Sequence, residues 1–148
     1  MPDKVHWQHL IPHRGAMCLL DAVAAWDETG IHARAGTHRD PGNPLRADGS
    51  LHAVNLCEYG AQAMAVHGGL LAQREGAAAA PGLLVSLREV KLRAIRIDDL
   101  PGDLEIRAEK IAAGADAMQY AFHIEHAGVV LAEGRAAVMA SRPGRRPA

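Results

Sequence analysis

The segment Leu51–Gly69 reads LHAVNLCEYGAQAMAVHGG and contains a single formally charged residue, Glu58. Small and apolar side chains fill most of its other positions, which is typical of a helix that is buried around most of its circumference. An ionised carboxylate in such a helix costs several kcal/mol unless it is paired or neutralised. The segment therefore predicts a buried central helix, with Ser50 as its N-cap and Gly68-Gly69 near its end, and it makes Glu58 a candidate functional acid.

The sequence on both sides of this helix predicts strands. Residues 16–26 form an apolar run, residues 31–37 alternate weakly, and residues 38–50 combine Pro, Gly, Asn and Asp as loops do. Residues 83–140 change to a two-residue period, seen most clearly in 104–109. They predict about four strands joined as consecutive antiparallel hairpins.

The order of these elements predicts an α+β fold in which an antiparallel β-sheet wraps around one long central helix. A chain of 148 residues fits one domain, which is expected to comprise residues 1–141. The basic residues 142–148 are expected to form a flexible C-terminal tail.

Composition excludes several classes of partner. The 16 Lys and Arg residues and 17 Asp and Glu residues give a net charge of -1, and the basic residues are spread along the chain, which argues against a nucleic-acid binder. The central helix carries Asn55, Gln62 and His67 and is therefore too polar to span a membrane. The N-terminus has no basic stretch followed by an apolar core, so no secretory signal is expected and the predicted location is the cytoplasm.

No metal or cofactor site is expected. The two cysteines, Cys18 and Cys57, lie in apolar runs without a Cys-x-x-Cys spacing, so they are expected to be buried free thiols. His123 and His126 are three residues apart on a predicted strand and therefore point to opposite faces. The chain contains neither a Gly-rich phosphate loop nor a Gly-x-Ser-x-Gly elbow.

Two motifs resemble those of the 3-hydroxyacyl-acyl-carrier-protein dehydratases. Residues 10–23 read LIPHRGAMCLLDAV and resemble the N-terminal signature of that family, which has Leu-Pro-His-Arg, an apolar run, and then Asp and Val. Residues 56–63 read LCEYGAQA and resemble its Leu-Glu-Ala-x-Ala-Gln helix, with Glu58 at the catalytic acid and Gln62 at the glutamine. The Glu-Tyr-x-Ala-Gln form of this helix is similar to the branch that is associated with aryl polyene synthesis.

This resemblance implies the hotdog fold and a hydro-lyase activity. The expected reaction converts a 3-hydroxyacyl thioester, carried by an acyl carrier protein, to a trans-2-enoyl thioester in fatty-acid or polyene synthesis, without a cofactor. The expected assembly is a homodimer or a larger hotdog oligomer in which two subunits contribute to each site.

The resemblance also implies roles for individual residues. Glu58 is expected to act as the acid, while the start of the helix, at Ala53, offers backbone N–H groups to the thioester oxygen. Gln62, His13 and Arg14 are expected to bind the substrate. The alternative for His13 and Arg14 is a structural role in a turn or across a dimer.

One part of the family pattern is missing. The catalytic histidine of the family lies in a His-Phe-Pro-Gly loop, and its spacing from the acid leads here to Pro44, beside Asn43. Asn43 is the nearest counterpart; it can orient a substrate carbonyl but cannot act as a base at neutral pH. His52, in the predicted first helical turn, is a candidate for the missing base, and His38 has a weaker claim.

Several alternatives stay open. Glu58 can be a helix-surface carboxylate or an acid tied to an arginine in a subunit interface. The protein can be a hotdog thioesterase in which Asn43 positions a water molecule and Glu58 acts as base or nucleophile, or a non-catalytic partner subunit of a heteromeric dehydratase. The Lys91, Arg93 and Arg96 group is either a docking site for an acidic carrier protein or the solvated side of a strand.

Overall fold

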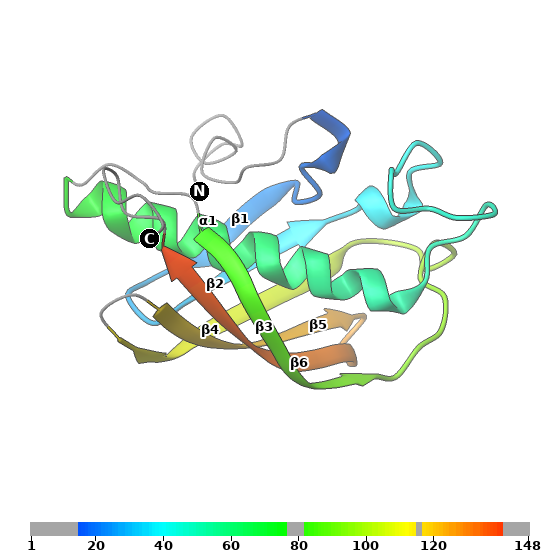
Figure 1. The fold of residues 1–148 in the computed structure, drawn as a ribbon. Coiled ribbons are helices and arrows are strands. Elements are labelled where there is room, and N and C mark those ends of the chain that lie inside the picture. The colour runs from blue at the N-terminus through cyan, green and yellow to red at the C-terminus, as the bar shows by residue number, and fades with distance from the viewer. Residues whose placement is uncertain (1–14, 77–81, 115–116, 141–148) are drawn as a thin grey trace, which may run out of the picture.

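The computed structural model describes residues 15–76, 82–114 and 117–140, and within them a six-stranded antiparallel sheet curves around one long helix (Figure 1). This arrangement confirms the predicted α+β hotdog fold. The helix is α1 (Leu56–Arg74), and three short 3-10 segments, η3 (Gly15–Met17), η4 (Thr37–Arg39) and η5 (Ala53–Asn55), lie before it in the chain. The strands are β1 (Ala22–Trp26), β2 (Gly30–Ala35), β3 (Gly82–Leu92), β4 (Leu104–Ala113), β5 (Ala117–His126) and β6 (Val129–Ala140).

The strand order is β1-β2-β4-β5-β6-β3, which corrects one prediction. β4, β5 and β6 form consecutive hairpins as expected, but β3 pairs with β6 and not with β4. Ala127 and Gly128, both with positive φ, close the β5–β6 hairpin as a tight turn. The connection between β3 and β4, residues 93–103, is too long for a tight hairpin turn. It carries the chain from the β3 edge past β6 and β5 to β4 in the middle of the sheet.

The predicted strand over residues 16–26 starts too early, because β1 begins only at Ala22. Asp21 N, directly before β1, already donates to a strand, to Arg34 O of β2 at 2.9 Å, whereas Leu19 bonds to side chains. Leu19 N donates to Gln62 Oε1 at 2.9 Å, and Leu19 O accepts from Thr37 Oγ1 at 2.7 Å.

The helix also begins later and ends later than predicted. Ser50 is not its N-cap, because the residues that follow pair with residues 95–97 before the helix starts: Ile97 N donates to Leu51 O, and Ala53 N to Ile95 O. The Gly68-Gly69 pair does not end the helix, which continues to Arg74. Burial of this part of α1 in the core outweighs the cost of glycine, which is about 1 kcal/mol per residue in a helix. No helix within the described residues is long and apolar enough to cross a membrane.

Phe122, the one phenylalanine of the chain, sets the distance between helix and sheet. It is almost fully buried, and its ring lies between two residues that have no side chain, Gly60 of α1 and Gly134 of β6. A Cβ atom at Gly60 would lie 2.8 Å from Phe122 Cδ2, and one at Gly134 would lie 3.0 Å from Cε1 and Cζ. Glycine at both positions is therefore what allows the ring to fit.

The substitutions Gly60→Ala and Gly68→Ala test this packing within one helix. A Cβ at Gly68 meets Met118 Cε at 3.5 Å, which is an ordinary contact, so both variants gain the same helix propensity but Gly60→Ala must also displace a ring. Overpacking costs about 1–3 kcal/mol, and Gly60→Ala is expected to be less stable than Gly68→Ala by this amount in urea unfolding. Equal stability of the two variants would contradict the packing.

His67 joins α1 to β5 and to the end of β1 inside the core. Its ring is fully buried, with Nδ1 2.7 Å from Tyr120 Oη and Nε2 2.8 Å from Asp27 O. Because a backbone carbonyl can only accept, Nε2 carries the proton and Nδ1 accepts from the tyrosine hydroxyl. Burial lowers the pKa of His67, so the ring is neutral in the folded protein.

This neutral ring predicts that stability depends on pH. The pKa of His67 in the folded state lies below its ordinary value of 6.5, so the unfolded chain binds the proton more tightly. Above about pH 6.5 the neutral ring contributes its full stabilisation. At lower pH the free energy of unfolding falls by up to about 1.4 kcal/mol per pH unit. Urea unfolding as a function of pH should show a shallower slope for His67→Gln than for the wild type. His123→Gln, at a partly exposed position of β5, is the control; a wild-type slope in His67→Gln would show that the ring is not kept neutral.

Candidate functional site

The carboxylate of Glu58 lies in the first turn of α1 and is partly buried. Its Oε1 accepts a hydrogen bond from Gln62 Nε2, one helical turn further on, at 3.3 Å. Glu58 is thus held in a partly buried position by the amide of the next helical turn.

Gln62 joins this carboxylate to the segment that precedes β1. Its side chain is buried; Oε1 accepts from Leu19 N at 2.9 Å and Nε2 donates to Met17 O at 2.7 Å. These bonds hold residues 17–19 against the helix beside Glu58. Because the oxygen and the nitrogen of the amide are both bonded to the protein, the structure favours a positioning role for Gln62 over the predicted role in binding substrate. His13 and Arg14, a few residues upstream, lie outside the described residues.

The start of the helix is already hydrogen-bonded within the chain. Ala53 N donates to Ile95 O at 2.8 Å, Val54 N to His52 Nδ1 at 2.9 Å, and Asn55 N to His52 O at 3.1 Å. Ala53 is fully buried. The sequence predicted that the N–H group of Ala53 is offered to a thioester oxygen. In a single chain this N–H group is instead bonded to Ile95 O.

Asn43 has the contacts of a residue that organises a loop. Its Nδ2 donates to Thr37 O at 2.9 Å and to Tyr59 Oη at 3.2 Å, and its Oδ1 accepts from Leu45 N at 2.9 Å. The side chain is 6% exposed. The amide fastens the loop between η4 and η5 to the helix through Tyr59, and none of these contacts supports the role in orienting a substrate that was predicted for it.

His52 is exposed at the start of η5, and its Nδ1 accepts the hydrogen bond from Val54 N. A neutral imidazole that accepts at Nδ1 carries its proton on Nε2. In this arrangement His52 offers a hydrogen-bond donor to a ligand, and not the lone pair that the predicted base requires.

His38 in η4 has the properties that His52 lacks. Its ring is fully buried, and Nε2 lies 2.9 Å from Leu100 O, so Nε2 carries the proton and the lone pair is on Nδ1. Nδ1 is the one buried side-chain nitrogen or oxygen that has no partner among the described residues. Desolvation lowers the pKa of His38, which keeps the ring neutral. A neutral ring with an unused lone pair is chemically a base.

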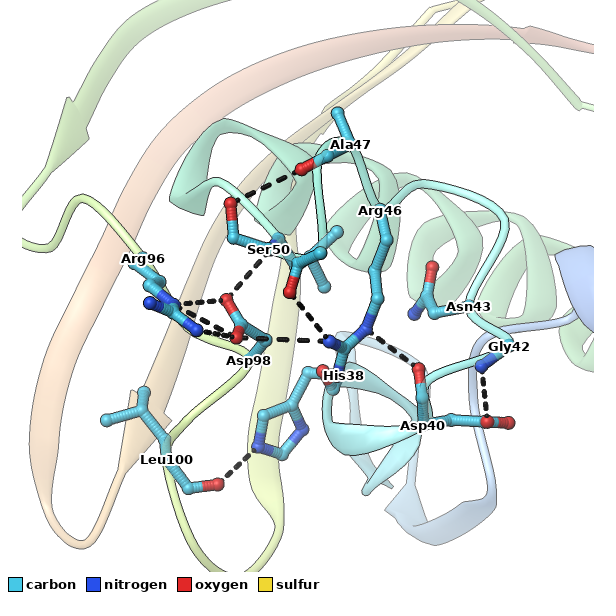
Figure 2. A network of polar contacts seen from close by, with 12 residues as sticks. His38, Asp40, Gly42, Asn43, Arg46, Ala47, Ser50, Arg96, Asp98 and Leu100 are labelled. Atoms are coloured by element: carbon cyan, nitrogen blue, oxygen red, sulfur yellow. Dashed lines mark hydrogen bonds and ion pairs between the residues drawn. The ribbon is translucent and has the colours of Figure 1, made fainter.

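A polar network surrounds His38 (Figure 2). Arg46 donates to three backbone carbonyls of the loop, those of Asp40, Gly49 and His38. Asp98, whose side chain is 4% exposed, accepts from Leu51 N at 2.8 Å and from Arg96 at 2.7–3.0 Å, and its Oδ2 lies 3.9 Å from Arg46 Nη1. The hydrogen bonds from Arg96 hold the pKa of Asp98 far below its usual range.

A family model described as ApeP-like, ApeP dehydratase, matches residues 5–145. The chain belongs to the ApeP-like dehydratase family. This confirms the predicted resemblance to dehydratases and to their aryl-polyene branch. No curated protein matches the chain.

Solved structures show the same fold as this ApeP-like dehydratase. A chain of the dehydratase heterocomplex ApeI:P from Xenorhabdus doucetiae superposes with a TM-score of 0.82 at 23% identity, covering 92% of this chain and 91% of that one. A putative thioesterase from Shewanella oneidensis gives 0.64 at 11% identity, with 94% of each chain covered. AziG from S. sahachiroi gives 0.62 at 17% identity, with 83% of this chain and 91% of that chain covered.

The sequence carries a signal for His38 that the spacing from Glu58 does not reveal. Residues 38–42 read HRDPG, which resembles the His-Phe-Pro-Gly loop with one additional residue between the histidine and the Pro-Gly pair. Counting back from Glu58 at the family spacing leads instead to Pro44, beside Asn43. A search for a histidine before any Pro-Gly pair would have found His38.

The remaining candidate groups among the residues that the structure describes are metal ligands, thiols and the lining of a hollow. No group of three or more His, Cys, Asp or Glu residues there could hold a metal ion. Cys18 is buried and Cys57 half-buried, no disulfide joins them among the described residues, and burial raises the pKa of Cys57. A hollow of about 570 Å³ lies over the sheet among residues such as His32, Arg107 and His123, and none of the predicted catalytic or substrate-binding residues lines it, although Lys91 does.

The substitution Gln62→Ala tests the attachment of residues 17–19 to α1. The buried Leu19 N–H loses its acceptor, and an unsatisfied buried donor costs about 1–3 kcal/mol. Urea unfolding should show this loss. Gln119→Ala, at an exposed position of β5, is the matched control and should change stability by less than about 0.5 kcal/mol. A loss in Gln62→Ala no larger than in the control would mean that the three bonds of Gln62 contribute nothing.

Proposed function

We propose that this ApeP-like dehydratase removes water from a 3-hydroxyacyl thioester, with Glu58 as the acid and His38 as the base. His38 Nδ1 takes the C2 proton, the C2–C3 double bond forms, and Glu58 gives a proton to the C3 hydroxyl, which leaves as water. The product is a trans-2-enoyl thioester. The observation that carries this proposal is the pair of groups in one family member: a shielded carboxylate and a neutral imidazole with a free lone pair.

The proposed site lies between two subunits. No hydrogen bond or ion pair is seen between Glu58 and His38 among the described residues of one chain, and the resemblance to hotdog dehydratases implies that each site draws on both subunits. Strand β3 supports this arrangement, because it is an edge of the sheet and, within the described part of the chain, pairs with β6 alone. Its Leu87 and Val90 are 39% and 37% exposed, and an edge strand with exposed apolar side chains is a natural place for a second chain to pair.

The proposed substrate is delivered by an acyl carrier protein. Arg93 and Arg96 follow the edge strand and have side chains that are 50% and 55% exposed, so they are accessible to an acidic carrier surface.

A second candidate is a subunit of a heteromeric dehydratase. The similarity to a chain of a solved dehydratase heterocomplex, at a TM-score of 0.82, supports it. In that case the chain supplies one half of each site and a related hotdog subunit supplies the other. The thioesterase alternative has less support, because the amide of Asn43 that would position a water molecule is fully used by the protein.

The test is to incubate purified protein with 3-hydroxyacyl thioesters on a carrier protein and to follow loss of water by mass spectrometry. Glu58→Gln and His38→Gln are each expected to lower the rate by about 10²–10⁴-fold, as is usual for a general acid or base. His123→Gln, on the outer face of β5, should keep wild-type activity.

The same assay separates the alternatives. Release of free thiol without an enoyl product would identify a thioesterase. A product that forms only after a related hotdog subunit is added would identify a heteromeric enzyme. No dehydration under either condition, or dehydration that is unaffected by Glu58→Gln, would refute the proposal.

A further inference from the structure

We propose that Arg46 and Asp98 are positioning residues that hold His38 in the orientation in which Nδ1 is free. This inference rests on the proposed function, in which His38 is the base. It assigns a function to the network of Figure 2, whose labelled members lie in the loop of residues 38–50 and in residues 96–100.

Arg46 closes the loop that carries His38. Its Nε donates to Asp40 O at 2.9 Å, Nη1 to Gly49 O at 3.2 Å and Nη2 to His38 O at 3.3 Å. The side chain is only 16% exposed. One planar guanidinium thus satisfies carbonyls from both ends of the loop, including that of His38 itself. A lysine has a single nitrogen and cannot bond to three carbonyls that are spread in this way.

Asp98 fixes Arg46 to the segment that also holds the His38 ring. Its carboxylate forms the ion pair with Arg46 at 3.9 Å and accepts from Leu51 N, at the approach to the helix. Two residues further along, Leu100 O accepts from His38 Nε2. Residues 98–100 therefore hold the backbone of His38 through Arg46 and its ring through Leu100.

The orientation matters because it selects the tautomer. As long as Nε2 faces Leu100 O, the proton stays on Nε2 and the lone pair stays on Nδ1. If the loop carbonyls lose Arg46, the loop is free to move and the ring can leave Leu100 O, so that either nitrogen can carry the proton. The other charged groups around the ring are Arg39, Asp103 and His126; none of them is altered by a substitution at Arg46.

The experiment compares Arg46→Gln, Arg46→Lys and Asp98→Asn with the wild type. Asp98→Asn keeps an oxygen for Leu51 N but removes the charge that faces Arg46. Arg135→Gln, which breaks an exposed ion pair with Glu89, is the control. The first readout is the ¹⁵N NMR spectrum of the His38 ring in the protein without substrate, which distinguishes the two tautomers. The second is kcat and KM for dehydration.

The wild type is expected to show a single neutral tautomer with the proton on Nε2. Arg46→Gln should show a mixture of tautomers and a kcat lowered by about 10–100-fold, as expected when a catalytic group is misplaced by about 1 Å, while KM changes little. Arg46→Lys should restore only a small part of kcat, and Asp98→Asn should change the tautomer in the same direction. The control should match the wild type in both readouts.

Three results would overturn the inference: a wild-type His38 with its proton on Nδ1, an Arg46→Gln variant with the wild-type tautomer and kcat, or full restoration by lysine. The wild-type spectrum decides the first of these even if a variant does not fold. The proposed function fails separately, because a protein that dehydrates no thioester, or in which His38→Gln stays active, can still show the predicted tautomer and its dependence on Arg46.

Discussion

The ring of Phe122 between Gly60 and Gly134 determines how closely the helix approaches the sheet, and the other features of the site depend on that distance. With few aromatic residues in the chain, most core positions are filled by aliphatic side chains and alanine, so one rigid ring has a large influence on the spacing. Gly60 lies two residues after Glu58 and two before Gln62. The contact that fixes the helix on the sheet is therefore in the same turn as the candidate acid and its amide partner.

From this fixed helix, two sets of polar contacts extend to the segments around it. On one side Gln62 holds residues 17–19, and on the other Tyr59 binds Asn43 and Thr37. Neighbouring residues of a helix point in different directions, so this single turn anchors both the segment before β1 and the loop that carries His38. Buried side-chain amides suit this task because they satisfy a backbone N–H and a backbone carbonyl at once, which a carboxylate or a hydroxyl does less completely.

The sequence was sufficient to predict the fold class, but it was not sufficient to predict which strands pair with each other. A two-residue period identifies β4 and β5 because each has one face on the core, whereas nothing in the local pattern of β3 says that it pairs with β6 instead of its neighbour in the chain. Ser50 resembled an N-cap because local patterns do not reveal that residues 51–53 first pair with residues 95–97. Glu58 was identifiable because a charge in an apolar helix is conspicuous. His38 was undervalued because its Pro-Gly pair lies one residue further away than in His-Phe-Pro-Gly. Its distinguishing property, a buried nitrogen without a partner, depends on the folded structure around the ring.

The loss of stability caused by the unpartnered Nδ1 of His38 helps to decide between an enzyme and a non-catalytic partner subunit. A buried polar atom without a partner lowers stability by about 1–3 kcal/mol, and a subunit that served only to complete an oligomer would gain nothing in return. His67 shows that the same chain can satisfy a buried histidine fully, with a tyrosine hydroxyl on one nitrogen and a carbonyl on the other. The contrast between the two histidines favours a chemical use for Nδ1 of His38. In a heteromeric dehydratase the same argument supports the proposal that this chain contributes an imidazole to the site, and not merely a surface on which another subunit assembles.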